Sequence, residues 1–159
     1  MRKREEDKMR EEGIHKIEVH VAGICLKNEE GRFKILIGKR TRSRQLFPNC
    51  WECGGGQVHR GENFVTALKR QMKGEFGIDV VVECPIGVYE IKTNNTIIPG
   101  LRFICRPKDN QQEIVVRKEL VEYKWIDESE IDIYEFIPGL KEDLKRALSL
   151  YKKILNRSE

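Results

Sequence analysis

The 159-residue sequence has no long apolar run and no large excess of charge of one sign. Its longest stretch without a charged residue, residues 93–101, is far shorter than the roughly 18 apolar residues of a membrane span. The net charge of +4, from 30 basic and 26 acidic residues, is too small to indicate nucleic-acid binding by itself. The charged first residues are atypical of a secretory leader. We therefore expect a cytoplasmic protein without membrane association.

The chain also lacks the paired cysteines of a disulfide framework. Its five cysteines are an odd number, and only Cys50 and Cys53 have Cys-x-x-Cys spacing. A zinc site needs a second such pair, and a redox dithiol is the other alternative. We expect reduced cysteines that pack as small apolar residues. The three histidines have no ligand spacing.

The organisation of the chain is that of one domain behind a charged extension. Ten of the first 12 residues are charged, with both signs equally represented, which predicts a solvated extension over residues 1–15. Residues 16–159 suit a single domain. Apolar periodicity predicts helices at 62–76 and 140–155, and strands at 18–26, 33–38, 80–82, 86–91, 101–105 and 121–125. This order predicts an α/β fold with a mixed sheet covered by helices.

The most informative segment is residues 51–78, WECGGGQVHRGENFVTALKRQMKGEFGI. A glycine-rich loop leads directly into the first predicted helix. Gln71, Gly74 and Glu75 are spaced at i, i+3 and i+4, so they share one face of that helix. Glu62 opens the helix, where a carboxylate suits the helix dipole, and Gly77 is a typical helix end.

This segment resembles the Nudix box. In that pattern a glycine is followed after five residues by a glutamate, and seven residues later by Arg-Glu, an aliphatic residue, any residue, Glu-Glu, any residue, Gly and an aliphatic residue. The matching residues are Gly56, Glu62, Arg70, Met72, Glu75, Gly77 and Ile78. The resemblance covers residues 16–155. It implies a Nudix-type α/β/α sandwich around a mixed β-sheet, and it allows a homodimer.

The activity that the resemblance implies is hydrolysis of a nucleoside diphosphate linked to another moiety, with Mg²⁺ or Mn²⁺ as cofactor. Two positions depart from the pattern, because Gln71 and Gly74 stand where the family has glutamates. Clustered carboxylates suit Mg²⁺, which prefers oxygen ligands. We expect Glu75 to be the main metal ligand, with the Gln71 amide and the Gly55 carbonyl as auxiliary ligands.

The two departures also leave a second class of function open, a nucleotide-binding or interaction module that kept the fold and lost catalysis. Other acids offer compensation, because Glu119 and Glu122 lie in a region that resembles the family's Glu-containing segment before a late strand. Either one is a candidate base, and the alternative is that both are solvent-facing charges. Arg70 belongs to the catalytic set that the resemblance implies. We expect it to act by supporting structure, as do the box residues Gly56, Glu62 and Gly77.

Residues 39–49 are polar and contain Pro48, which predicts a loop. Four cations cluster in its first part, at residues 39–44. Arg40, Arg42 and Arg44 are candidate ligands for substrate phosphates, and the alternative is a solvated loop. An RNA backbone is a weaker candidate for the same cations, and we do not expect RNA as a partner. Phe47 and Trp51 lie close enough in sequence to stack on a base, although core packing is the expected role of Trp51.

Overall fold

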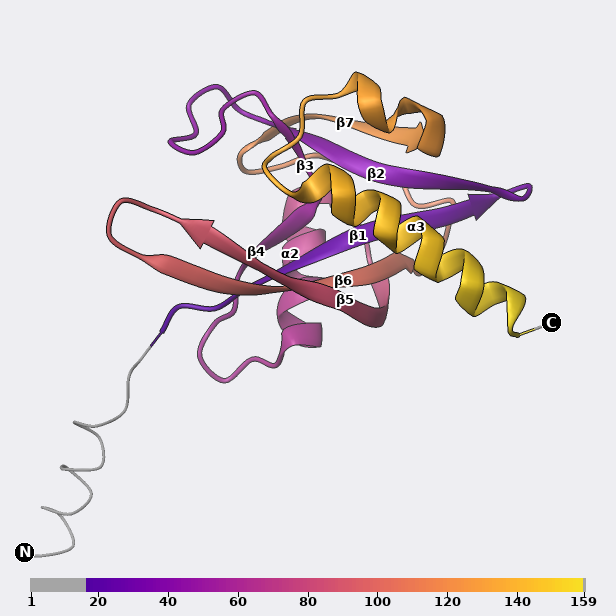
Figure 1. Ribbon diagram of the computed structural model, residues 1–159, viewed down its shortest axis with the longest axis horizontal. Helices are drawn as coiled ribbons and strands as arrows, with labels where there is room; N and C mark the ends of the chain where they lie inside the picture. Colours follow the sequence, from indigo (N-terminus) through magenta and orange to yellow (C-terminus); the bar gives the residue numbers. More distant parts are fainter. Residues whose placement is uncertain (1–16, 159) are drawn as a thin grey trace, which may run out of the picture.

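The computed structural model describes residues 17–158 (Figure 1), so the expected extension at 1–15 lies outside the described residues. No helix in the described part is long and apolar enough to cross a membrane. The elements in chain order are β1 (His20–Glu29), β2 (Arg32–Arg40), β3 (Trp51–Glu52), β4 (Gly54–Gln57), α2 (Phe64–Phe76), β5 (Val80–Lys92), β6 (Ile97–Pro107), β7 (Leu120–Asp127), the 3-10 helix η1 (Glu128–Ile133) and α3 (Leu140–Asn156).

The strands form one mixed sheet in the order β3-β2-β1-β6-β5, with β4 paired to β1 and β7 paired to β2. β1 runs parallel to β6, and the other pairs are antiparallel. β1 changes partner along its length: His20–Gly23 pair with β4, whereas Leu26–Glu29 pair with β2. The β3–β4 segment therefore crosses from β2 to β1 at the place where these two strands separate.

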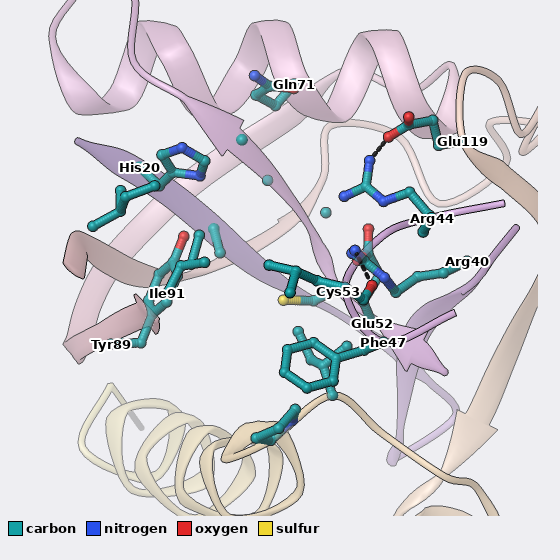
Figure 2. A pocket seen from close by; sticks show the side chains of 18 of the residues that line it. His20, Arg40, Arg44, Phe47, Glu52, Cys53, Gln71, Tyr89, Ile91 and Glu119 are labelled. Atoms are coloured by element: carbon teal, nitrogen blue, oxygen red, sulfur yellow. Dashed lines mark hydrogen bonds and ion pairs between the residues drawn. The ribbon is translucent and has the colours of Figure 1, made fainter. Parts of the chain in front are cut away.

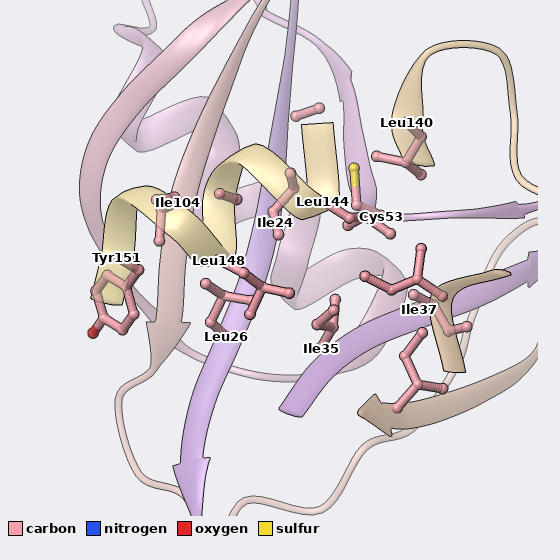
Figure 3. Close-up of a cluster of buried hydrophobic side chains, with 14 of the residues drawn as sticks. Ile24, Leu26, Ile35, Ile37, Cys53, Ile104, Leu140, Leu144, Leu148 and Tyr151 are labelled. Atoms are coloured by element: carbon pink, nitrogen blue, oxygen red, sulfur yellow. The ribbon is translucent and has the colours of Figure 1, made fainter. Parts of the chain in front are cut away.

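Each face of the sheet is covered by one helix. Side chains alternate along β1, so that Val21 and Cys25 face α2 while Ile24 and Leu26 face α3. The buried stripe on α2 is Ala67, Leu68, Met72 and Phe76, and the stripe on α3 is Leu140, Leu144, Ala147, Leu148 and Tyr151. Figure 3 shows α3 lying over Ile24, Leu26 and Ile104. These layers confirm the predicted α/β/α sandwich.

Three of the differences from the predicted boundaries have a clear physical reason. The predicted strands 80–82 and 86–91 are one strand, because bulges near Cys84 and Pro85 let β5 keep its pairing with β6. The first helix begins at Phe64, because the Asn63 side chain accepts the Thr66 N–H and caps it. Glu62 therefore precedes the helix. β2 extends to Arg40, so that residue is in a strand and not in the expected loop.

Candidate active site

The glycines before α2 let the helix lie directly against β4. A side chain at Gly55 would overlap the backbone of Val21, and a Cβ at Gly56 would stand 2.5 Å from the amide nitrogen of Gln71. Only glycine leaves room for so close an approach. The Gly55 N–H donates a 2.9 Å hydrogen bond to Glu75 Oε1. The glycine run thus brings two polar side chains of α2 against the backbone of β4.

Glu62 and Arg70 tie the loop between β4 and α2 to the helix. Arg70 donates two 2.8 Å hydrogen bonds to the Glu62 carboxylate and one of 2.9 Å to the Gln57 carbonyl. The same carboxylate accepts the His59 N–H at 2.8 Å. The hydrogen bonds from Arg70 are the main reason that the pKa of Glu62 is lowered to about 2. The hydrogen bonds of Glu62 and Arg70 therefore stabilise the conformation of the loop between β4 and α2.

Glu75 is a buried carboxylic acid at the centre of the site. Its side chain lies near the C-terminal end of α2, and the residue is 8% exposed. Burial and then the negative charge of Glu52 raise the pKa of Glu75 to about 8, although the Gly55 N–H, Lys118 and Arg44 oppose the shift. Glu75 is therefore mostly protonated at pH 7 unless a further cation stabilises its charged form.

The other two positions on this face of α2 have neutral or absent side chains. Gln71 is buried, and its amide donates a 3.3 Å hydrogen bond to the Gln57 carbonyl. Gly74 is covered by the side chain of Lys118: a Cβ at position 74 would stand 2.7 Å from Lys118 Nζ and 3.0 Å from its Cε. An ammonium group thus takes the space in which the Nudix box would place a glutamate side chain.

Two further cations approach Glu75 from the β2 side. Arg40 forms a buried ion pair with Glu52 and donates a 2.8 Å hydrogen bond to the Leu46 carbonyl. Its Nε is buried without a hydrogen-bond partner. Arg44, four residues further on, forms an ion pair with Glu119. Each arginine is therefore paired with a carboxylate, Arg40 with Glu52 and Arg44 with Glu119. Neither is the freely solvated cation of the alternative interpretation, a solvated loop.

These residues line a cavity of about 770 Å³. Its lining is charged or polar at one end, where it contains Arg40, Arg44, Glu52, Gln71, Glu75, Lys118 and Glu119. Much of the remaining lining is apolar or aromatic, with Leu46, Phe47, Tyr89, Ile91, Ile98, Ile137 and Pro138. Five polar or charged residues also line this part: His20, Glu90, Lys92, Thr93 and Arg102. Figure 2 shows Tyr89 and Ile91 on the opposite side of the cavity from Arg40 and Arg44. The cavity can accept a ligand with one anionic and one apolar part.

Three of the candidate catalytic and substrate-binding residues do not reach this cavity. Arg42 is exposed and is absent from the lining. Glu122 lies within β7, opposite Lys39 of β2, with an exposed side chain whose nearest cation is Lys124 at 3.9 Å. Arg70 contacts the loop instead. Of the two acids proposed as bases, only Glu119 lines the cavity.

The sequence prediction missed much of the lining, including Glu52, Tyr89, Arg102 and Lys118. Arg102 had a usable signal, because it is a charged residue inside an apolar strand. It is 3% exposed, forms an ion pair with Asp143 and lies 4.3 Å from the centre of the Tyr89 ring. Lys118 had no local signal, since only the fold carries it to α2.

The Cys-x-x-Cys spacing does not produce a metal centre in the described part of the chain. Residues 17–158 contain no group of three metal-ligating side chains. Cys50 and Cys53 are unpaired, and burial raises the pKa of Cys53 to about 12, so its thiol is unreactive at neutral pH. Trp51 is buried with its ring 5.2 Å from that of Tyr134. This segment is packed in the core.

The NUDIX domain model matches residues 18–148, which is most of the chain. The chain belongs to the NUDIX domain family. Similar solved structures support the fold. An Ap4A hydrolase from C. elegans has a TM-score of 0.73 at 13% identity, covering 86% of this chain and 99% of that one. The MutT protein of Methanosarcina mazei Go1 has a TM-score of 0.68 at 20% identity, covering 88% and 99%.

Two further relatives differ in their ligands. The NUDIX domain of Shewanella oneidensis NrtR, in complex with ADP ribose, has a TM-score of 0.70 at 11% identity and covers 88% of this chain and 92% of that one. The isopentenyl-diphosphate Delta-isomerase of Klebsiella pneumoniae (strain 342) is 26% identical over 123 residues, which is 69% of this chain. This Nudix chain spans only 61% of the isomerase.

Nudix hydrolases generally use divalent metals such as Mg²⁺. The expected donors are the carboxylate of Glu75, whose Oε1 accepts the Gly55 N–H, the amide of Gln71 and the carbonyl of Gly55, and all three residues line the cavity. Gly74 supplies none. Mg²⁺ in enzymes is commonly bound by one or two carboxylates together with substrate phosphates. The residues therefore fit one ion shared with a phosphate group of the substrate, and they do not fit an ion held by the protein alone.

Proposed function

We propose that this NUDIX-domain protein is a nucleotide pyrophosphohydrolase that cleaves a nucleoside diphosphate linked to another moiety. The observation that carries the proposal is the division of the cavity into two parts. A diphosphate suits the end with Arg40, Arg44 and Lys118, because phosphates are bound by arginine forks and lysine point charges. The apolar part near Tyr89 and Ile91 suits an organic group attached to the diphosphate, such as the nucleoside.

The relatives support the same class of ligand. Their names refer to Ap4A, ADP ribose and isopentenyl diphosphate, and each of these compounds carries a phosphoanhydride joined to an organic group. The shared chemistry is the diphosphate. The group attached to it differs among the relatives, so the substrate of this chain is defined here by class only.

Glu75, Gln71 and the Gly55 carbonyl would hold Mg²⁺ or Mn²⁺ together with the substrate's phosphates. When bound, such an ion neutralises phosphate charge and lowers the pKa of a bound water. Arg44 would orient the diphosphate from the β2 side. Glu119, which lines the cavity beside Arg44, would accept a proton from the attacking water. The water oxygen bonds to phosphorus, the anhydride P–O bond breaks, and two phosphate products leave.

We expect this reaction to take place in the cytoplasm. The five cysteines of the chain are all free in the structure, and unpaired cysteines are typical of a reducing compartment. The homodimer that the resemblance allows stays a prediction.

A direct test is phosphate release over a panel of nucleotides and nucleotide sugars, with Mg²⁺, Mn²⁺ or EDTA. We expect metal-dependent turnover, and at least a hundredfold loss of turnover in Glu75→Gln. Glu113→Gln, an exposed acid that does not line the cavity, is the matched control and should keep full turnover. Turnover that survives unchanged in Glu75→Gln would contradict the assignment of Glu75.

The second candidate function is a nucleotide-binding module without catalysis. The placement of Lys118 over Gly74, next to the neutral Gln71, favours it, because two of the three box carboxylates are gone. The double variant Gln71→Glu, Gly74→Glu distinguishes the two functions. A large gain from near-zero turnover indicates a site that has lost catalysis, whereas little change indicates a rearranged active site. Thermal-shift binding on the same panel records ligands that bind without turnover.

A further inference from the structure

The position of Lys118 is fixed by backbone contacts to the last turn of α2. The Arg117 N–H donates a 2.9 Å hydrogen bond to the Glu75 carbonyl, and the Val115 N–H donates one of 2.9 Å to the Phe76 carbonyl. These bonds satisfy carbonyls that the end of a helix leaves free. They hold the segment before β7 against α2, so the backbone position of Lys118 is fixed relative to the helix.

The backbone of Lys118 itself has an uncommon conformation. Its φ is +57°, in the left-handed region that few non-glycine residues adopt. Such a conformation persists where the surrounding structure imposes it, and it is frequent at ligand sites. Here it follows directly on the hydrogen bond of Arg117, and the Lys118 side chain lies across Gly74.

Glycine at position 74 is the counterpart of this lysine. A Cβ there would stand 2.7 Å from Nζ and 3.0 Å from Cε, so any larger residue would push the ammonium group away. Glycine in a helix interior is also less favourable than alanine, so position 74 gives up helix stability. The pair places a positive charge at a point where a glutamate would place a negative one. The local charge facing the cavity is therefore more positive by two units.

Lys118 is also the cation of the cavity without a local counter-charge. The other lysine and the arginines of the lining, Arg40, Arg44, Lys92 and Arg102, each form an ion pair with a carboxylate. Among residues 17–158, no carboxylate lies within ion-pair distance of Lys118 Nζ, although the ammonium is close enough to Glu75 to lower the pKa of that acid. An unpaired ammonium that lines a cavity is available to an anionic ligand.

We propose that Lys118 binds the diphosphate of the ligand directly, so that this cavity binds diphosphates without a divalent metal. Gly74 makes room for the ammonium. Arg44, which lines the same cavity, adds a second cation. The inference rests on the diphosphate ligand of the proposed function but does not require hydrolysis. It applies equally to a slow enzyme and to a module that only binds.

The test is calorimetric titration of the whole protein with inorganic pyrophosphate and with ADP, in excess EDTA. Wild type should bind both probes. Lys118→Ala should weaken binding at least tenfold, and Lys118→Arg should restore part of it. Lys69→Ala is the matched control, because Lys69 is an exposed lysine on α2 that does not line the cavity. It should bind as wild type does. Equal affinity in Lys118→Ala and wild type would overturn the proposal.

A second variant tests the same proposal at position 74, by placing a negative charge where the Lys118 ammonium lies. Gly74→Glu should displace or neutralise the ammonium, so that pyrophosphate binding in EDTA falls as in Lys118→Ala. The same variant should gain a thermal shift on addition of Mg²⁺ alone, which wild type lacks. Circular dichroism checks that the helix is retained. A Gly74→Glu variant that is folded and binds pyrophosphate in EDTA at wild-type affinity would also overturn the proposal.

The two proposals fail separately. If wild type turns over a nucleotide with Mg²⁺ but binds neither probe in EDTA, the hydrolase stands and the role of Lys118 is wrong. If it binds the probes in EDTA through Lys118 but hydrolyses nothing in the panel, the role of Lys118 stands and hydrolysis is wrong.

Discussion

The carboxylate of Glu75, near the end of α2, accepts a 2.9 Å hydrogen bond from the backbone N–H of Gly55 in β4. This bond joins the last turns of the helix to the glycine run that precedes it by 20 residues. It also excludes water from one oxygen of a carboxylate that burial already penalises. The protonation state of Glu75 is therefore coupled to the packing of α2 against β4, and this coupling can be measured.

The stability of the protein should depend on pH through Glu75. Its pKa is about 8 in the folded protein and has an ordinary value of 4.5, so the folded state keeps a proton that the unfolded chain releases. Stability should fall as pH rises from about 4.5 to about 8. Glu75→Gln has no carboxyl group to titrate, so it should not lose this stability. At pH 8 its free energy of unfolding should exceed that of wild type by a few kcal/mol, because each unit of pKa difference corresponds to about 1.4 kcal/mol.

Urea unfolding at pH 5 and at pH 8.5, with EDTA present, checks this expectation. The advantage of Glu75→Gln should be small at pH 5 and close to its full size at pH 8.5. Parallel pH dependence of the variant and wild type would show that Glu75 is not the titrating group.

The two acids near β7 should behave differently. Both side chains are exposed, but Glu119 lines the cavity and pairs with Arg44, whereas Glu122 lies outside the cavity. We expect Glu119→Gln to lower kcat tenfold to a thousandfold, within the usual range for loss of a general base, and Glu122→Gln to leave kcat unchanged. Steady-state kinetics on the substrate found in the panel decides this. A loss in Glu122→Gln alone would reverse the assignment.

Alanine should have opposite effects at two glycines of the box. Gly74→Ala should stabilise α2 by up to about 1 kcal/mol, because only the flexible end of Lys118 has to move. Gly77→Ala should destabilise the protein by about 1 kcal/mol, because Gly77 ends the helix with a φ of +72°. Equilibrium unfolding of both variants in urea measures the two signs. Destabilisation by Gly74→Ala would mean that Lys118 is held more rigidly than its length suggests.

Loss of Arg70 should loosen the loop between β4 and α2. Arg70→Ala removes three hydrogen bonds, two to Glu62 and one to the Gln57 carbonyl. Amide hydrogen exchange at His59, whose N–H the Glu62 carboxylate accepts, should accelerate at least tenfold. Arg60→Ala, at an exposed position in the same loop, should leave that exchange rate unchanged. Unchanged exchange in Arg70→Ala would show that the loop is held by other contacts.

Much of the architecture followed from local pattern. The apolar spacing of Leu68, Met72 and Phe76 predicted the helix, and the strand order with two helices predicted the layers. The start of the helix at Phe64 was missed because the cap of Asn63 depends on a single side-chain bond. Arg40 was expected in a loop, since its burial depends on Glu52, which the sequence pattern does not connect to it.

The sequence by itself determined the fold and the identity of the helix face that carries the box. Both are properties of short-range spacing, in which residues three or four apart share a face and neighbouring strands alternate. Only the tertiary structure decided what surrounds Glu75. Lys118, Glu52 and Arg102 arrive from elements far apart in the chain, through backbone pairing and buried ion pairs that no local pattern encodes. Local spacing in the sequence therefore identifies the helix face that borders the cavity, whereas the tertiary fold decides which charged residues surround that face.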